Sequence, residues 1–156
     1  MSATFEFDAD DLIAAIERLV PDLNDAAGEA MAFGADLATA EAKRLAPKGP
    51  TGLLSNSILS LPVLGTFTNG TLEVDVLAGA PYALPVEEGT QAHDIIPRFR
   101  RALRFPGPGG FTFAKKVRHP GTAPQPFMAP ALERAADPLV AALRSQIERT
   151  MRKHGF

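Results

Sequence analysis

The sequence of 156 residues contains no cysteine, no tryptophan and a single tyrosine. The lack of cysteine excludes disulfides, thiolate metal sites and cysteine nucleophiles together, so stability must come from packing or from assembly. No apolar run approaches the roughly 18 residues that a membrane-spanning helix needs, and the N-terminal MSATFEFDADDL is acidic where a signal peptide would be basic. We therefore expect no membrane partner and a protein assembled in the cytoplasm.

Acidic residues are missing from one stretch of the chain. Residues 1–94 carry 15 acids and 4 bases, whereas residues 95–132 carry 7 bases and no acid. The basic stretch can attract the acidic part of another copy of the chain, or a polyanion such as a nucleic acid. The alternative is that the acidic and basic surfaces are both simply solvated. We call these seven residues the basic band, expected to face a neighbouring subunit or DNA: Arg98, Arg100, Arg101, Arg104, Lys115, Lys116 and Arg118.

Length and composition predict one folded domain over residues 1–156, with 46% hydrophobic and 22% charged residues. A short, peripheral helix is expected within residues 1–21, ended by Val20-Pro21 because the residue before a proline is disfavoured in a helix. A second helix is expected from Asp22 to Leu45. Its apolar stripe is rich in alanine and glycine, and we favour packing of this stripe on a sheet over contact with a neighbouring subunit. A long C-terminal helix is expected to begin near Met128, with Pro130 tolerated in its first turn.

Strands are expected in the middle of the chain. Around the turn signal Asn69-Gly70, apolar residues alternate with Glu73, Asp75 and Leu77. Residues 82–88 suggest one or two helical turns. Residues 98–105 and 111–118 suggest a hairpin in which the phenylalanines lie on one face and the basic residues on the other. The predicted class is therefore α+β, with an antiparallel sheet of four to five strands and a basic hairpin.

No constellation of catalytic or metal-binding residues is recognisable. The three histidines have no paired ligand spacing, although His93 and His119 can meet in space near Glu87, Glu88 or Asp94. Glu87 and Glu88 are adjacent, so their side chains diverge on either a helix or a strand. No serine lies in a nucleophile elbow, and no glycine loop precedes a helix to cradle phosphate. We expect no enzyme activity, no metal and no cofactor.

Four segments in a fixed order carry a resemblance to a known family. They are AEAKRLAP with TGLLSNSI at 40–58, APYALPVEEGT at 80–90, the basic strands ending in VRHPGT at 117–122, and PQPFMAPALERA at 124–135. Together they make the chain resemble the long-tailed bacteriophage neck and tail-completion proteins typified by gene product ten of phage HK ninety-seven. The resemblance covers residues 40–136.

The resemblance implies a small α+β virion protein in the phage neck or tail. Such a protein forms a homo-oligomeric ring, expected to be a hexamer, that joins the capsid connector to the tail around the DNA channel, as a neck, tail-completion or tail-terminator component. Other phage neck and tail proteins would be partners, and the DNA phosphate backbone in the channel is a further candidate. No catalysis is implied.

A second set of candidate residues shapes the backbone or packs rather than reacts, as a joint between subunits requires. We call them the joint residues: Tyr82, Val86, Glu88, Gly89, Thr90, His119, Pro120, Gly121, Pro126 and Phe127.

Two other classes of function stay open. A nucleic-acid-binding domain without sequence specificity is suggested by basic residues interleaved with phenylalanines, but stacking on bases requires both on the same surface, and the expected hairpin separates them. A hydrolase or nuclease has no supporting constellation.

Overall fold

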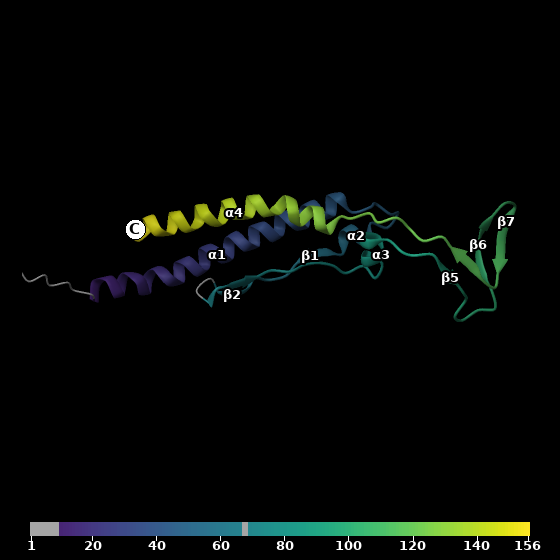
Figure 1. The fold of residues 1–156 in the computed structure, drawn as a ribbon, viewed down its shortest axis with the longest axis horizontal. Helices are drawn as coiled ribbons and strands as arrows, with labels where there is room; N and C mark the ends of the chain where they lie inside the picture. The colour runs from purple at the N-terminus through teal and green to yellow at the C-terminus, as the bar shows by residue number, and fades with distance from the viewer. Residues whose placement is uncertain (1–9, 67–68) are drawn as a thin grey trace, which may run out of the picture. The chain divides into compact units, whose positions relative to one another are not determined.

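Two long helices and short antiparallel strand pairs make up the fold. The computed structural model describes residues 10–66 and 69–156 (Figure 1). The α+β class is confirmed, and so is the long C-terminal helix. The elements in order are α1 Asp10–Leu45, α2 Leu53–Asn56, β1 Ile58–Ser60, β2 Leu64–Thr66, β3 Thr71–Glu73, β4 Val76–Ala78, α3 Ala83–Glu88, β5 His93–Ile95, β6 Leu103–Gly107, β7 Gly110–Ala114, β8 Val117–His119 and α4 Met128–Lys153.

The chain forms two compact units. One consists of Met1–Ala80 with Phe127–Phe156, which we call the helical unit, and the other is Pro81–Pro126, which we call the hairpin unit. The single domain expected over residues 1–156 stays a prediction, because a compact unit within a small chain is not by itself an independently folding domain.

The predicted break at Val20-Pro21 is wrong, because α1 is one helix with Pro21 inside it. The expected short helix of residues 1–21 is thus the beginning of α1 as far as it is described, and residues 1–9 lie outside the described part. A proline costs the helix one hydrogen bond, but packing against another helix can offset that cost. Next to Pro21, the Asp22 carboxylate accepts hydrogen bonds from Lys153 at 2.6 Å and pairs with His154 at 2.9 Å, which ties α1 to the end of α4.

The small-residue stripe of α1 packs on α4, which lies beside it (Figure 1). The expected partner was a sheet, and α1 does also contact β1, β3 and β4. A Cβ placed on Gly34 would lie 2.8 Å from Leu139 Cδ1 and 3.0 Å from its Cβ, so the helices approach closely there. Phe127, at the start of α4, is fully buried. The alanines with the lowest exposure on α1 and α4 are Ala27, Ala30, Ala38, Ala42, Ala131 and Ala135.

The strands pair two by two in the described part of the chain, rather than in one sheet of four to five strands. β1 pairs with β4, β2 with β3, β5 with β8, and β6 with β7, all antiparallel. Pro62 separates β1 from β2, and Pro97 stands between β5 and β6. Because proline cannot donate a ladder hydrogen bond, it limits how far a ladder extends.

The expected alternation over residues 72–78 is confirmed in the helical unit. Leu72, Val74, Val76 and Ala78 are half-buried, whereas the residues between them are exposed. On β1, Ile58 is fully buried, and the Ser60 hydroxyl donates to Asp36 Oδ1 of α1 at 3.2 Å. The inner face of β1 and β4 therefore lies on α1.

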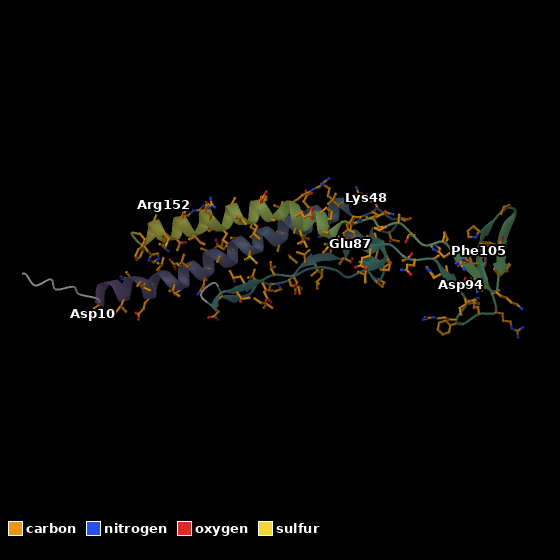
Figure 2. The ribbon with its side chains drawn as sticks, in the orientation of Figure 1. Asp10, Lys48, Glu87, Asp94, Phe105 and Arg152 are labelled. Carbon is orange, nitrogen blue, oxygen red and sulfur yellow. The ribbon has the colours of Figure 1, made fainter. Side chains whose placement is uncertain are left out.

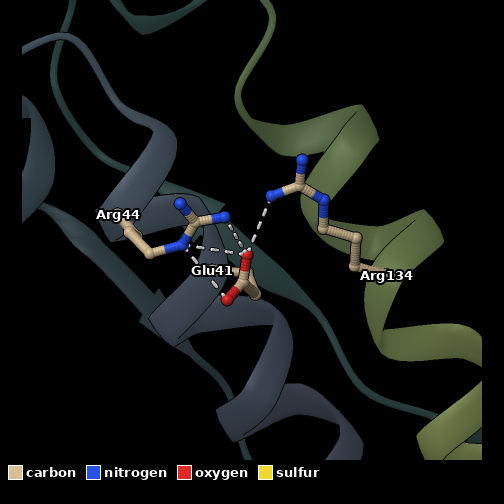
Figure 3. A network of polar contacts seen from close by, with 3 residues as sticks. All are labelled: Glu41, Arg44 and Arg134. Carbon is tan, nitrogen blue, oxygen red and sulfur yellow. Dashed lines mark hydrogen bonds and ion pairs between the residues drawn. The ribbon is translucent and has the colours of Figure 1, made fainter.

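An ion-pair network joins the two helices near the end of α1 (Figure 3). The Glu41 carboxylate accepts hydrogen bonds from Arg44 Nη2 at 2.7 Å and from Arg134 Nη1 of α4 at 3.1 Å. Hydrogen bonding, first from Arg44 and then from Arg134, holds the pKa of Glu41 below its ordinary value.

We predict that Gly34→Ala brings none of the stability that Gly28→Ala brings. Both substitutions favour the helix by about 0.5–1 kcal/mol. A Cβ on Gly28 meets nothing within 4 Å, whereas one on Gly34 presses on Leu139, and such overpacking costs about 1–3 kcal/mol. Urea unfolding at equal protein concentration measures both variants. Equal stabilisation by the two would contradict the close helix approach.

We predict that Glu41→Gln lowers the unfolding midpoint at neutral pH and that this difference disappears in acid. Because the folded pKa of Glu41 lies below its unfolded value, its stabilisation is fully present above the unfolded pKa and is lost as pH falls through the folded pKa. Thermal unfolding from pH 7 to pH 2 measures the effect. Glu148→Gln is the control, since among the described side chains Glu148 forms an ion pair only with Arg152 of the same helix, at 3.8 Å. A pH-independent difference would contradict the prediction.

Candidate functional site

The basic band lies entirely in the hairpin unit, and all seven of its residues are exposed. They do not share one hairpin face, as the sequence suggested. The expected strand 98–105 begins only at Leu103, so the first three arginines lie in an irregular segment. The expected strand 111–118 is divided into β7 and β8, because β8 pairs with β5 instead of continuing along β6. Of the band, only Arg104 lies on the β6–β7 hairpin.

The register of that hairpin corrects the predicted faces. Gly107 pairs with Gly110 across a two-residue turn at Pro108 and Gly109, so Arg104 lies opposite Phe113. Directly opposite residues share a face, and a shift of one residue turns every side chain over. Phenylalanines 111 and 113 therefore lie on the same face as Arg104. The prediction of opposite faces is therefore wrong.

We define the hairpin face as Arg104, Pro106, Phe111 and Phe113. The Arg104 guanidinium carbon lies 3.5 Å from the centroid of the Phe111 ring, a cation–π contact. Phe111 and Phe113 are 58% and 66% exposed. Phe105, labelled in Figure 2, lies on the opposite side of the hairpin, and this residue is 37% exposed. An apolar and cationic surface thus stands open to a partner.

The arginine segment before β6 adds to this exposed surface. Phe99 is 97% exposed between Arg98 and Arg100. Beside it lies an open hollow of about 510 Å³, lined by Pro97, Arg98, Phe99, Arg100, Ala102, Leu103 and Arg104. Within the described residues only one basic-band side chain forms an ion pair, Lys116 with Asp94 at 2.7 Å. The charge of the other six is not compensated there.

The structure brings His93 and His119 together, as the sequence allowed. They are register partners in β5 and β8, and their rings stack with centroids 5.1 Å apart. His119 Nδ1 accepts a hydrogen bond from the Gly121 amide at 3.1 Å, and His93 Nδ1 lies 2.9 Å from the Gln91 carbonyl. Asp94 points to Lys116, and no group of three metal-ligating side chains is found among the described residues. These contacts organise a turn.

Some joint residues meet where the hairpin unit begins and ends. Thr90 and Thr122 exchange backbone hydrogen bonds of 3.0 and 3.1 Å, and their hydroxyls lie 2.9 Å apart. The Gln125 amide donates to the Val86 carbonyl at 2.9 Å. Gly89 and Gly121 have φ of 75° and 91°, and a Cβ on either would collide with the facing backbone. Four other joint residues are instead exposed: Tyr82, Glu88, Pro120 and Pro126.

A second exposed surface lies on the helical unit, where no functional site was expected from the sequence. Leu59 faces Leu77 in the β1–β4 register, and the Leu61 amide extends this ladder by donating to the Asp75 carbonyl at 2.8 Å. Leu64 pairs with Glu73 in β2–β3. In the sequence, the indication of this surface is Leu77, an apolar residue at a position of the alternating pattern where Glu73 and Asp75 are polar. We define the ladder face as Leu59, Leu61, Leu64, Leu77, Glu73 and Asp75.

Comparison of the chain with family models, with curated proteins and with solved structures gives no match. In the part of the chain that the structure describes, no helix is long and apolar enough to cross a bilayer. The features that bear on function are therefore the exposed surfaces of the two units and the four sequence segments.

Proposed function

We propose that this chain is a structural virion protein that self-associates into a ring at the phage head–tail junction. In that role it joins the capsid connector to the tail around the DNA channel, with other neck and tail proteins as neighbours and without catalysis. The four ordered sequence segments support the phage assignment, and the distribution of charge supports the self-association.

The observation that carries the proposal is the opposite charge of the two units. Residues 1–80 and 127–156 carry 15 acids and 9 bases, whereas residues 81–126 carry 3 acids and 7 bases. Complementary fields favour contact between unlike patches on different copies. Head-to-tail contact of unlike patches closes into a ring when the rotation permits.

The composition of the buried core supports assembly as well. Of the 15 buried apolar residues described, 11 are alanines, and the only large side chains that are fully buried are Phe127 and Ile58. In contrast, many large apolar side chains are exposed on both units. Large exposed apolar surfaces are typical of chains that bury them against a partner.

We predict that the triple reversal Arg100→Glu, Arg101→Glu and Arg104→Glu prevents ring formation and virion completion while the fold is retained. The reversal replaces attraction between the units of adjacent copies by repulsion. Mass photometry and end-on electron microscopy measure assembly, and circular dichroism checks folding. Unchanged rings would contradict the role of the basic band.

The matched control carries the same change in charge elsewhere. Arg18→Glu, Arg144→Glu and Arg149→Glu reverse three exposed arginines of α1 and α4. This variant should still form rings, expected to be hexameric. If both variants fail equally, net charge rather than the basic band controls assembly.

A second candidate function is nucleic-acid binding without sequence specificity. The observation that favours it is the common face of Arg104, Phe111 and Phe113, because aromatic and basic side chains on one surface suit a nucleic-acid strand. The separation of aromatic and basic residues that had weakened this candidate is therefore removed.

We predict that any DNA contact is to phosphate and indifferent to sequence. If about four basic residues reach phosphates, the plot of log binding constant against log salt concentration has a slope of about −4. Filter binding across a salt series measures this slope for several duplex sequences. A slope near zero would assign the basic band to protein contacts, and a strong preference for one sequence would contradict the phosphate contact.

A further inference from the structure

We propose that the hairpin face of one copy docks on the ladder face of a second copy. The inference rests on the proposed ring and specifies the two surfaces that join its subunits. Each surface is exposed, each combines apolar and charged side chains, and the charges are opposite.

The ladder face is an apolar strand surface without a cover in the described chain. Its leucines are exposed by 47% at Leu59, 38% at Leu61, 64% at Leu64 and 47% at Leu77. In β1, β3 and β4, which contact α1, the alternate side chains are buried or half-buried, so these strands have one covered side and one open side. Leucines directly opposite each other on an open strand pair are a usual contact for another apolar surface.

The hairpin face has the composition that concentrates binding energy at protein interfaces. Arginine and aromatic residues are enriched in the centres of such interfaces. The Arg104–Phe111 contact holds the cation against the ring, so both groups are presented together. Phe113, opposite Arg104 in the register, supplies an exposed ring that can lie on leucine side chains.

Charge identifies a second copy as the occupant. Glu73 and Asp75 form no ion pair with any described side chain, and neither does Arg104. When the faces meet, the Arg104 guanidinium lies near carboxylates and the phenylalanines lie near leucines. Each copy then offers both surfaces, so every contact in a ring has the same form.

A cysteine cross-link tests the contact directly, because the chain contains no cysteine of its own. Full-length Phe113→Cys and Leu77→Cys chains are mixed and oxidised mildly. One chain carries a size tag, so that the heterodimer separates from both homodimers on a non-reducing gel. We expect at least about tenfold more disulfide-linked heterodimer than with Phe105→Cys in place of Phe113→Cys. Phe105 lies on the opposite side of the hairpin, so it reports on random collision.

Charge exchange provides an independent test. Arg104→Glu alone, and Glu73→Arg with Asp75→Arg, should each weaken self-association about tenfold or more, because like charges then face each other. A one-to-one mixture of the two variants should restore it, since both kinds of contact in the mixed ring again join opposite charges. Mass photometry measures all three samples, and circular dichroism confirms that each variant is folded.

The outcomes separate this inference from the proposed ring. If rings form without the cross-link and the mixture restores nothing, the docking is overturned while the ring stands. If the wild-type chain forms no oligomer, both fall. A chain that carries both Phe113→Cys and Leu77→Cys provides a further check: a disulfide formed only within that chain, and none between the single-cysteine chains, would also overturn the docking between copies. Loss of DNA binding in Arg104→Glu, with self-association unchanged, would assign the hairpin face to nucleic acid.

Discussion

The close packing of α1 on α4 is the contact on which the helical unit depends. Alanine and glycine line it, so the two helices approach closely, and Gly34 leaves room for Leu139. Small side chains bury little apolar area each, and hydrophobic stabilisation scales with buried area, so this core is modest for its length. The Glu41 network and the Asp22 contacts hold the pair at two further places.

The alanine-lined contact has a consequence for the rest of the molecule. Large apolar side chains that another chain of this size would bury stand instead on the ladder face and on the hairpin unit. Subunits of an assembly often present such surfaces to their neighbours, with exposed leucine and phenylalanine side chains next to charges that have no partner within the chain. This is the physical reason for proposing self-association rather than a pocket-based activity.

Two sequence-based errors have physical explanations. The break at Pro21 was predicted from local backbone restriction. The Asp22 contacts with Lys153 and His154 tie the helix to the end of α4 beside the proline, and a local rule does not include such contacts. The faces of the hairpin were predicted from alternation along each strand alone. Alternation does not determine which face of one strand meets which face of the next, because a two-residue turn sets that register.

The sequence by itself determined four features: the α+β class, the long C-terminal helix, the alternation over residues 72–78 and the concentration of basic charge after Ile95. These follow from periodicity and composition, which are local properties of the chain. Only the tertiary structure decided that α4 covers the small-residue stripe, that strands pair two by two, and that Arg104 shares a face with Phe111 and Phe113. These depend on which distant segments pair and in what register. Contacts of that kind are set by packing and turn geometry together, which no single segment encodes.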